Sequence, residues 1–250
     1  MANLDVEKKP QSGEHRFEFA TIQDYYDNVY YGGAGSREIS AHYRRLARRF
    51  QPWRGKKLLD VACGVGLWLR AAVELGAIPV GIDISPVALD VCKASLPGAG
   101  LLCAPAERLP FADGRFDFIS CLGALEHFLE PETALREMIR VAKPDADFLL
   151  LVPNAGFLTR RLGLFAGTRQ VEVREEVRSL EEWQRLFESV GLRIEKRWRD
   201  LHVVSWSWIM RGPKHLRPMR AAQALALPFW PLSWQYQVYH QCVRKWRESE

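Results

Sequence analysis

Residues 57–152 alternate short apolar runs with helical stretches, and this alternation constrains the fold more than any other feature of the chain. The apolar runs carry few charges, which is typical of strands that are buried on both faces of a sheet. A strand followed by a helix, repeated, predicts an α/β fold with a parallel sheet covered on both faces. The expected strands are 57–62, 78–84, 101–104, 116–121 and 148–152, and the expected helices are 65–75, 85–94 and 132–142.

The flanking segments differ from this repeat, and they divide the chain into four expected parts. Residues 1–15 are polar and are expected to form a mobile lead-in, whereas the aromatic residues 16–54 are expected to form a helical lid. Residues 55–154 hold the alternating core, and residues 155–250 are expected to complete the sheet and to add an aromatic-rich insertion beside the substrate. The elements expected in the last part are a helix at 180–190 and strands at 192–198 and 235–243.

Composition excludes several classes of protein. The 250 residues carry 35 Lys and Arg against 30 Asp and Glu, a net charge of +5, which permits anionic partners without requiring them. The N-terminus lacks the apolar stretch of a secretory signal, and no run approaches the length of a membrane span. The five cysteines do not form a CxxC pair, so a disulfide framework or a zinc site is not expected, and a reducing cytoplasm is the expected location. The cysteines are Cys63, Cys92, Cys103, Cys121 and Cys242.

The segment Asp60–Gly66 carries the strongest functional signal. It ends an apolar strand with a glycine-containing turn that opens a helix, a geometry that lets a ligand approach bare backbone beside helix N–H groups. Asp83 follows at the end of the next apolar strand, where a carboxylate can accept hydrogen bonds from both hydroxyls of a ribose. The two features together predict an adenosine-type cofactor.

The charge of this segment argues against a dinucleotide. A dinucleotide site requires a third glycine three residues after the second for close helix packing, and that position is Leu69. Asp60 precedes the turn, where its carboxylate would repel a phosphate and attract an ammonium group. A Walker loop is also excluded, because no Gly-Lys-Ser/Thr follows the turn. The expected ligand is therefore a nucleoside that carries a cation.

At this point the chain resembles the class I S-adenosylmethionine-dependent methyltransferases, in particular the group that includes quinone-type and other small-molecule methyltransferases. The resemblance extends from about Leu58 to Asn154. It implies a Rossmann-like, doubly wound sheet of seven mostly parallel strands with helices on both faces, and S-adenosylmethionine as the cofactor. The matching segments are 60–66, 81–85, 106–111, 116–119, 125–127 and 140–144.

The resemblance also implies a set of cofactor contacts. The first loop would line the methionine part, Asp83 would hold the ribose, and Ala106 and Glu107 would lie near adenine. The full set of expected cofactor contacts is Asp60, Ala62, Cys63, Gly64, Gly66, Asp83, Ile84, Ala106, Glu107, Leu122 and Tyr26. The other tyrosines of the N-terminal part are expected to pack in the core.

Two positions depart from the family pattern. Ala62 replaces the first glycine of the loop, which costs little if its φ angle is negative. Pro105 replaces an acid that commonly accepts a hydrogen bond from the adenine amino group, so cofactor affinity is weakened unless Glu107 compensates. These departures keep open a second hypothesis, a non-catalytic subunit that retains the fold.

His127 is the candidate catalytic base, because it follows the fourth strand at the carboxyl edge of the sheet, where an acceptor should lie. A packing or hydrogen-bonding role for the same side chain stays open. Glu126 is a weaker candidate that also suits the capping of a helix start. His202 and His240 are further candidates for the pocket.

The acceptor is expected to be a small molecule that is methylated on oxygen or nitrogen, with a lipid, a quinone or a glycan precursor as alternatives. The Asp/Asn-Pro-Pro-Tyr loop of base-methylating enzymes is missing, so a nucleic acid is not expected, although the arginines of residues 44–49 together with Arg160 and Arg161 keep RNA or protein methylation open. Residues 225–234 are rich in Trp, Leu and Pro and lie near Arg217, Arg220 and Arg244. They suit peripheral membrane contact, a pocket cover or a homodimer surface.

Overall fold

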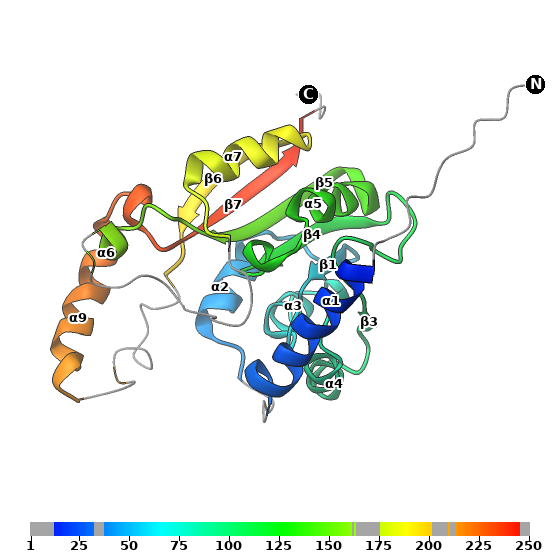
Figure 1. Cartoon of the computed structure of the whole chain (residues 1–250), viewed down its shortest axis with the longest axis horizontal. Helices are drawn as coiled ribbons and strands as arrows, with labels where there is room; N and C mark the ends of the chain where they lie inside the picture. Colours follow the sequence, from blue (N-terminus) through cyan, green and yellow to red (C-terminus); the bar gives the residue numbers. More distant parts are fainter. Residues whose placement is uncertain are drawn as a thin grey trace, which may run out of the picture.

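A seven-stranded sheet forms the centre of the molecule in the computed structural model, which describes residues 13–32, 38–161, 163, 176–201, 210 and 214–245. The strand order is β3-β2-β1-β4-β5-β7-β6 (Figure 1). The first five strands pair in parallel, and β7 runs antiparallel between β5 and β6. The strands are β1 Lys57–Val61, β2 Ile78–Asp83, β3 Gly100–Cys103, β4 Phe116–Leu122, β5 Ala142–Pro153, β6 Leu192–Arg199 and β7 Gln237–Arg244. The expected α/β fold with a mostly parallel, doubly wound sheet is confirmed.

Helices cover both faces of this sheet. On one face α5 (Pro131–Val141) and α7 (Leu180–Ser189) pack their apolar sides on the strands, and on the other face α2 (Ala41–Arg49), α3 (Leu67–Val73) and α4 (Pro86–Ser95) do the same. Leu58 and Leu59 of β1 point into the two different cores, as alternation along a strand requires. The fully apolar strands of the sequence are therefore explained by burial on both faces.

Shorter helices connect these layers and extend the two ends of the chain. The N-terminal part holds α1 (Gly13–Tyr25) and the π-helix η1 (Tyr26–Tyr30). In Figure 1, α1 lies along the front of the molecule and α9 lies on the side of the β6–β7 edge, away from β3. The remaining elements are η2 Leu125–His127, α6 Leu158–Arg161, η3 Lys214–Leu216, α9 Arg217–Ala226, η4 Leu227–Phe229 and η5 Leu232–Trp234. None of the helices that the structure describes is long and apolar enough to cross a membrane.

Several element boundaries differ from the expected ones for physical reasons. Helix α1 begins at Gly13, inside the segment 1–15 that was expected to be a mobile lead-in, whose first twelve residues lie outside the described part. Helix α3 begins at Leu67 and not at residue 65, because Gly66 takes a left-handed conformation at the N-cap. Strand β5 begins at Ala142, six residues before its apolar run, because Ala142 pairs with Phe116 before a register shift in β4.

The strand order reverses between β1 and β4, and this reversal positions the candidate site. Strands β2 and β3 follow β1 outward on one side, whereas β4 and β5 extend on the other. Crossover connections leave the sheet in opposite directions from such a point, so a crevice opens at the carboxyl ends of the strands. Asp60, Asp83 and Leu122 lie at or next to the carboxyl ends of β1, β2 and β4.

Candidate functional site

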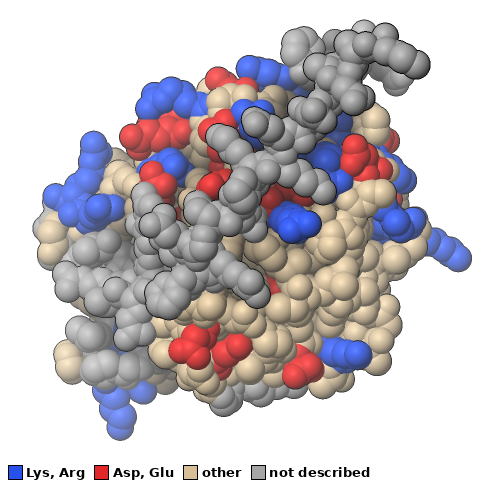
Figure 2. Space-filling view, turned by 45° about the vertical axis from the view of Figure 1, so that its right-hand side comes forward, with Lys and Arg blue, Asp and Glu red and all other residues tan. Residues whose placement is uncertain are grey.

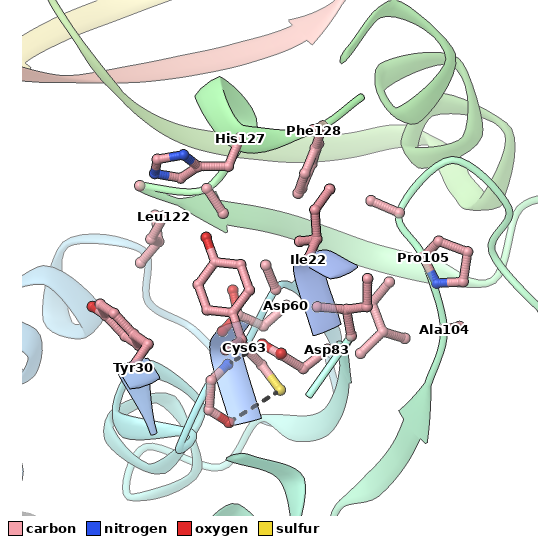
Figure 3. A pocket seen from close by; sticks show the side chains of 18 of the residues that line it. Ile22, Tyr30, Asp60, Cys63, Asp83, Ala104, Pro105, Leu122, His127 and Phe128 are labelled. Carbon is pink, nitrogen blue, oxygen red and sulfur yellow. Dashed lines mark hydrogen bonds between the residues drawn. The ribbon is translucent and has the colours of Figure 1, made fainter. Parts of the chain in front are cut away.

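A cavity of about 270 Å³ lies at this crevice, between the carboxyl ends of β1, β2 and β4 and the N-terminal helices. It contains nearly all of the expected contact residues, namely Tyr26, Asp60, Ala62, Cys63, Gly64, Asp83, Ile84, Ala106, Glu107, Leu122 and His127. Gly66 lies outside the lining at the start of α3. The sequence pattern thus led to one cavity, and Figure 3 shows its labelled side chains around a common space.

The loop after β1 is wound tightly by three residues with positive φ angles. These are Ala62 at 59°, Gly64 at 51° and Gly66 at 74°. A side chain on Gly66 would meet the Cys92 sulfur, because a built Cβ atom lies 2.3 Å from its Sγ atom. The φ angle of Ala62 is positive, so the condition under which alanine would cost little is not met, and this alanine holds a conformation that favours glycine.

Asp83 organises the loop from the neighbouring strand. Its Oδ2 atom accepts a hydrogen bond from the Gly64 amide at 2.7 Å, and its Oδ1 atom accepts one from the Ser85 amide at 2.9 Å. Burial raises the pKa of this carboxyl group, although both hydrogen bonds oppose the rise. The Ile84 backbone also donates to this carboxylate, which has about four acceptor sites in all, so capacity for a ligand hydroxyl remains.

Asp60 is the second buried acid of the cavity, and only 3% of its surface is exposed. Its Oδ1 atom accepts a hydrogen bond from the Ser120 hydroxyl at 2.6 Å, and the Trp68 indole donates to the same hydroxyl oxygen at 2.9 Å. Burial raises the pKa of Asp60 to about 7, and the nearby Asp83 adds to the rise. A cation in the cavity would reverse this shift, because it favours the ionised carboxylate.

The charges of the cavity wall have one sign. Asp60, Asp83 and Glu107 are in the lining, whereas no Lys or Arg from the described part of the chain is. Burial also raises the pKa of Glu107. A phosphate would therefore meet only acidic groups here, and a ligand that combines hydroxyl groups with a positive charge fits the wall.

The lining on the side of β3 suits a flat apolar group. Figure 3 shows Ala104 and Pro105 on the opposite side of the cavity from Tyr30 and Leu122, with Asp60 and Asp83 between them. Glu107 accepts a hydrogen bond from the Glu130 amide at 3.4 Å, which ties this segment to the start of α5. Glu107 comes two residues after Pro105, the position at which the family resemblance leads one to expect an acid beside adenine.

The N-terminal helices cover the cavity with aromatic side chains. We call α1, η1 and the following residues to Gly32 the N-terminal cap. Ser85 donates a hydrogen bond to Asp27, and the Tyr31 hydroxyl lies so close to Gly64 that a Cβ atom there would be 2.6 Å away. The cap tyrosines Tyr26, Tyr30 and Tyr31 all line the cavity. Burial raises the pKa of Tyr26 and Tyr31, so both phenols stay neutral and add no charge.

His127 lies beside the cavity on the turn after β4. The 3₁₀ turn η2 presents its ring to the cavity together with Leu122 and Phe128 (Figure 3). Glu126 does not cap a helix as expected, because Ala124 holds the N-cap position of η2 and Glu126 itself is buried within the turn.

Two other histidines, His202 and His240, were candidates for the pocket, and the structure describes only His240. His240 lies in β7, packs against Phe187 and is fully buried, and burial lowers its pKa to about 3. The expectation that it lines the pocket is therefore wrong. His202, like Trp206, Trp208 and Trp246, lies outside the described residues.

Sequence reasoning missed several residues of the wall. Tyr30, Tyr31 and Tyr43 were expected to pack in the core, yet all three line the cavity, as does Trp68 of α3. Tyr43 is half-buried near Asp60 and Asp200, and desolvation raises its pKa. The regular spacing of Tyr43 and the other apolar residues along α2 predicted correctly that they share one helix face. The spacing does not tell whether that face lies against the core or against a ligand cavity.

The sheet is doubly wound, and the cavity at its switch point is lined by three acidic side chains and by no Lys or Arg of the described residues. The residues 59–150 match the family described as a methyltransferase domain. This match confirms, for that part of the chain, the family resemblance seen in its motifs.

Relatives with assigned names support the same family. A demethylmenaquinone methyltransferase of Renibacterium salmoninarum is 38% identical over 90 residues, which cover 36% of this chain and 38% of that protein. An uncharacterized methyltransferase of Bacillus subtilis is 31% identical over 167 residues, which cover 62% of this chain and 65% of that protein. The aligned part is thus less than two thirds of the length of each relative.

A solved structure extends the likeness of fold to nearly the whole chain. The 1,6-didemethyltoxoflavin-N1-methyltransferase of Burkholderia thailandensis, solved with 1,6-didemethyltoxoflavin and S-adenosylhomocysteine, superposes with a TM-score of 0.60 at 14% identity. The match covers 97% of this chain and 94% of that one. At this identity the likeness concerns the fold alone.

Proposed function

We propose that this protein transfers the methyl group of S-adenosylmethionine to a small-molecule acceptor, on oxygen or nitrogen. The observation that carries the proposal is the charge of the cavity wall. Three carboxyl groups and no described Lys or Arg side chain face a space at the switch point of the sheet. Such a wall repels phosphates and favours a nucleoside with a sulfonium and an ammonium group.

The residues present fit this cofactor. The Asp83 carboxylate keeps acceptor capacity for a ribose hydroxyl after its bonds to the backbone of Gly64, Ser85 and Ile84. Asp60 would face the ammonium group, and the segment from Ala104 to Glu107 would enclose the adenine ring. When bound, the cofactor supplies an activated methyl group.

The side chains contribute alignment and exclusion of water. The N-terminal cap closes the cavity with neutral tyrosines, which holds a bound donor in a dry and fixed position. An oxygen acceptor must lose a proton during transfer, and a nitrogen acceptor must be neutral. We propose that His127 accepts this proton through its imidazole ring, because it is the only described histidine of the cavity wall.

A small acceptor is supported by one solved structure and by the surface. The Burkholderia structure holds a small heterocycle, whereas the Renibacterium relative is named for demethylmenaquinone, which supports the quinone alternative. On the face drawn in Figure 2, the Lys and Arg side chains lie interspersed with Asp and Glu and do not form one continuous basic surface. Nucleic-acid binding depends on such a basic surface, so this distribution supports a small molecule.

Calorimetric titration with S-adenosylmethionine and with S-adenosylhomocysteine tests the donor site. We expect micromolar binding of both, and Asp83→Ala should abolish it. Asp90→Ala is the matched control, because Asp90 is an exposed acid of α4 outside the cavity wall. If the wild-type protein binds neither compound, the proposal fails and a non-catalytic subunit explains the fold better.

The acceptor and the base can be tested together. Product masses from a panel of phenols, amines, sugars and quinone precursors would identify accepted substrates. With an accepted phenol, His127→Gln should lower kcat by about 10²–10⁴ and leave the dissociation constant of S-adenosylhomocysteine unchanged. An unchanged kcat across the pH range would show that His127 only packs against the acceptor.

A further inference from the structure

An exposed apolar tip projects from the β6–β7 side of the sheet. We call residues Lys214–Trp234, which comprise η3, α9, η4 and η5, the C-terminal tip. Its large apolar side chains lie in water, with exposed fractions of 87% for Phe229, 75% for Leu225 and 59% for Met219. Figure 1 shows α9 standing beyond the edge of the sheet. Three exposed apolar side chains of this size within residues 219–229 mark the tip as a candidate interaction surface.

The base of this tip is held by buried polar contacts. The Gln235 amide is buried and donates to the carbonyl oxygens of Leu227 at 2.9 Å and Trp230 at 3.3 Å. The Asn154 amide donates to the Ser233 carbonyl oxygen at 2.9 Å, and the Arg199 guanidinium donates to the Pro228 carbonyl oxygen. The structure therefore fixes the turn that carries Phe229, so its exposure follows from a defined fold of the tip.

The charge of this region is unusual for the chain. Residues 201–247 contain seven Lys and Arg and not one Asp or Glu. The seven positive charges of this segment exceed the net charge of +5 of the whole protein, so the rest of the chain has a small negative net charge. Of the cations in the C-terminal tip, Lys214 is exposed and Arg217 and Arg220 are half-buried. Apolar and basic side chains thus lie on the same projection.

We propose that the C-terminal tip inserts its apolar side chains into the interfacial region of an anionic lipid bilayer. Apolar residues on a projecting element enter the acyl boundary, while Lys and Arg beside them contact anionic headgroups. A second copy of the chain fits less well, because a two-fold dimer through the tip would bring two basic surfaces together. The inference goes beyond methyl transfer and does not depend on the donor site.

Flotation with vesicles tests the proposal directly and without cofactor. The purified full chain should float with vesicles of phosphatidylcholine and phosphatidylglycerol, and binding should weaken as the salt concentration rises. Phe229→Ser should lower the partition coefficient about tenfold, because an apolar side chain of this size contributes more than the free energy of one decade. The matched control is Leu102→Ser, which removes an exposed apolar side chain from the opposite edge of the sheet.

Charge variants separate the two contributions. Replacing Lys214 and Arg220 by Gln should lower binding to anionic vesicles by about fivefold for each cation and leave binding to pure phosphatidylcholine unchanged. Lys93→Gln on α4 is the matched control, because Lys93 is exposed on another element. Thermal unfolding of each variant would verify that it remains folded.

Three outcomes would overturn the proposal. The first is that anionic vesicles fail to bind the wild-type protein at low salt. The second is an equal loss of binding in Leu102→Ser and Phe229→Ser, which would show that the tip has no special role. The third is a dimer in sedimentation that Phe229→Ser dissociates, which would identify the tip as an interface between copies.

Discussion

Replacement of Ala62 by glycine should stabilise the protein, although it removes a methyl group. Ala62 is the only residue other than glycine with a positive φ angle in the part that the structure describes, and its angle is 59°. The left-handed conformation costs an alanine about 1–2 kcal/mol through the contact of its Cβ atom with the backbone. Glycine avoids this cost but gains about 0.5–1 kcal/mol of entropy in the unfolded chain. The net gain in the free energy of unfolding is therefore about 1 kcal/mol.

The measurement is urea unfolding, supported by thermal unfolding, in which the midpoint should rise by about 2–4 °C for a chain of this size. Ala155→Gly is the matched control, because Ala155 is a half-buried loop residue whose φ angle is not positive. The same chemical change should destabilise the protein there by about 0.4–1 kcal/mol. Equal losses in both variants would refute the reasoning, since they would show that Ala62 bears no conformational cost.

Two further predictions concern the same loop. The affinity for S-adenosylhomocysteine should rise with pH, because its ammonium group favours an ionised Asp60, whose pKa is raised to about 7 in the free protein. In calorimetry, binding should be about tenfold weaker at pH 6 than at pH 8, and the Asp60→Asn variant should lose this pH dependence. If the variant keeps the pH dependence, another group causes it. Gly66→Ala should destabilise the protein by about 2 kcal/mol or more, since its Cβ atom would meet the Cys92 sulfur and its φ angle is 74°. Cys92→Ala should recover part of this loss in a double-mutant cycle, whereas additive losses would exclude the contact.

The sequence predicted the core of the fold because its strands are apolar on both faces. Strands such as β1 and β2 leave largely apolar runs, and the acids near their carboxyl ends mark the site. Asp60 and Asp83 were found for this reason. The start of β5 was missed because its first residues lie at a register shift, where polar side chains are tolerated.

The aromatic wall of the cavity was harder to predict for a different reason. A tyrosine on a helix face gives the same periodic signal whether it faces a core or a ligand cavity. Tyr43 follows the apolar spacing of α2, and Tyr31 takes its place against Gly64 through tertiary packing. The sign of the φ angle of Ala62 could not be predicted from the sequence either, because an alanine at this position is compatible with both signs and the loop conformation decides between them.

The place of β7 between β5 and β6 has a consequence for synthesis on the ribosome. Among the described residues β6 pairs only with β7, so it cannot join the sheet until residues 237–244 have emerged. The parallel strands β1 to β5 can pair before β7 has been synthesised. Until then, the edge of β5 that later pairs with β7 has unpaired backbone groups. Because Phe148, Leu150 and Val152 lie on that strand, the nascent chain passes through a stage in which an apolar edge is open to other chains.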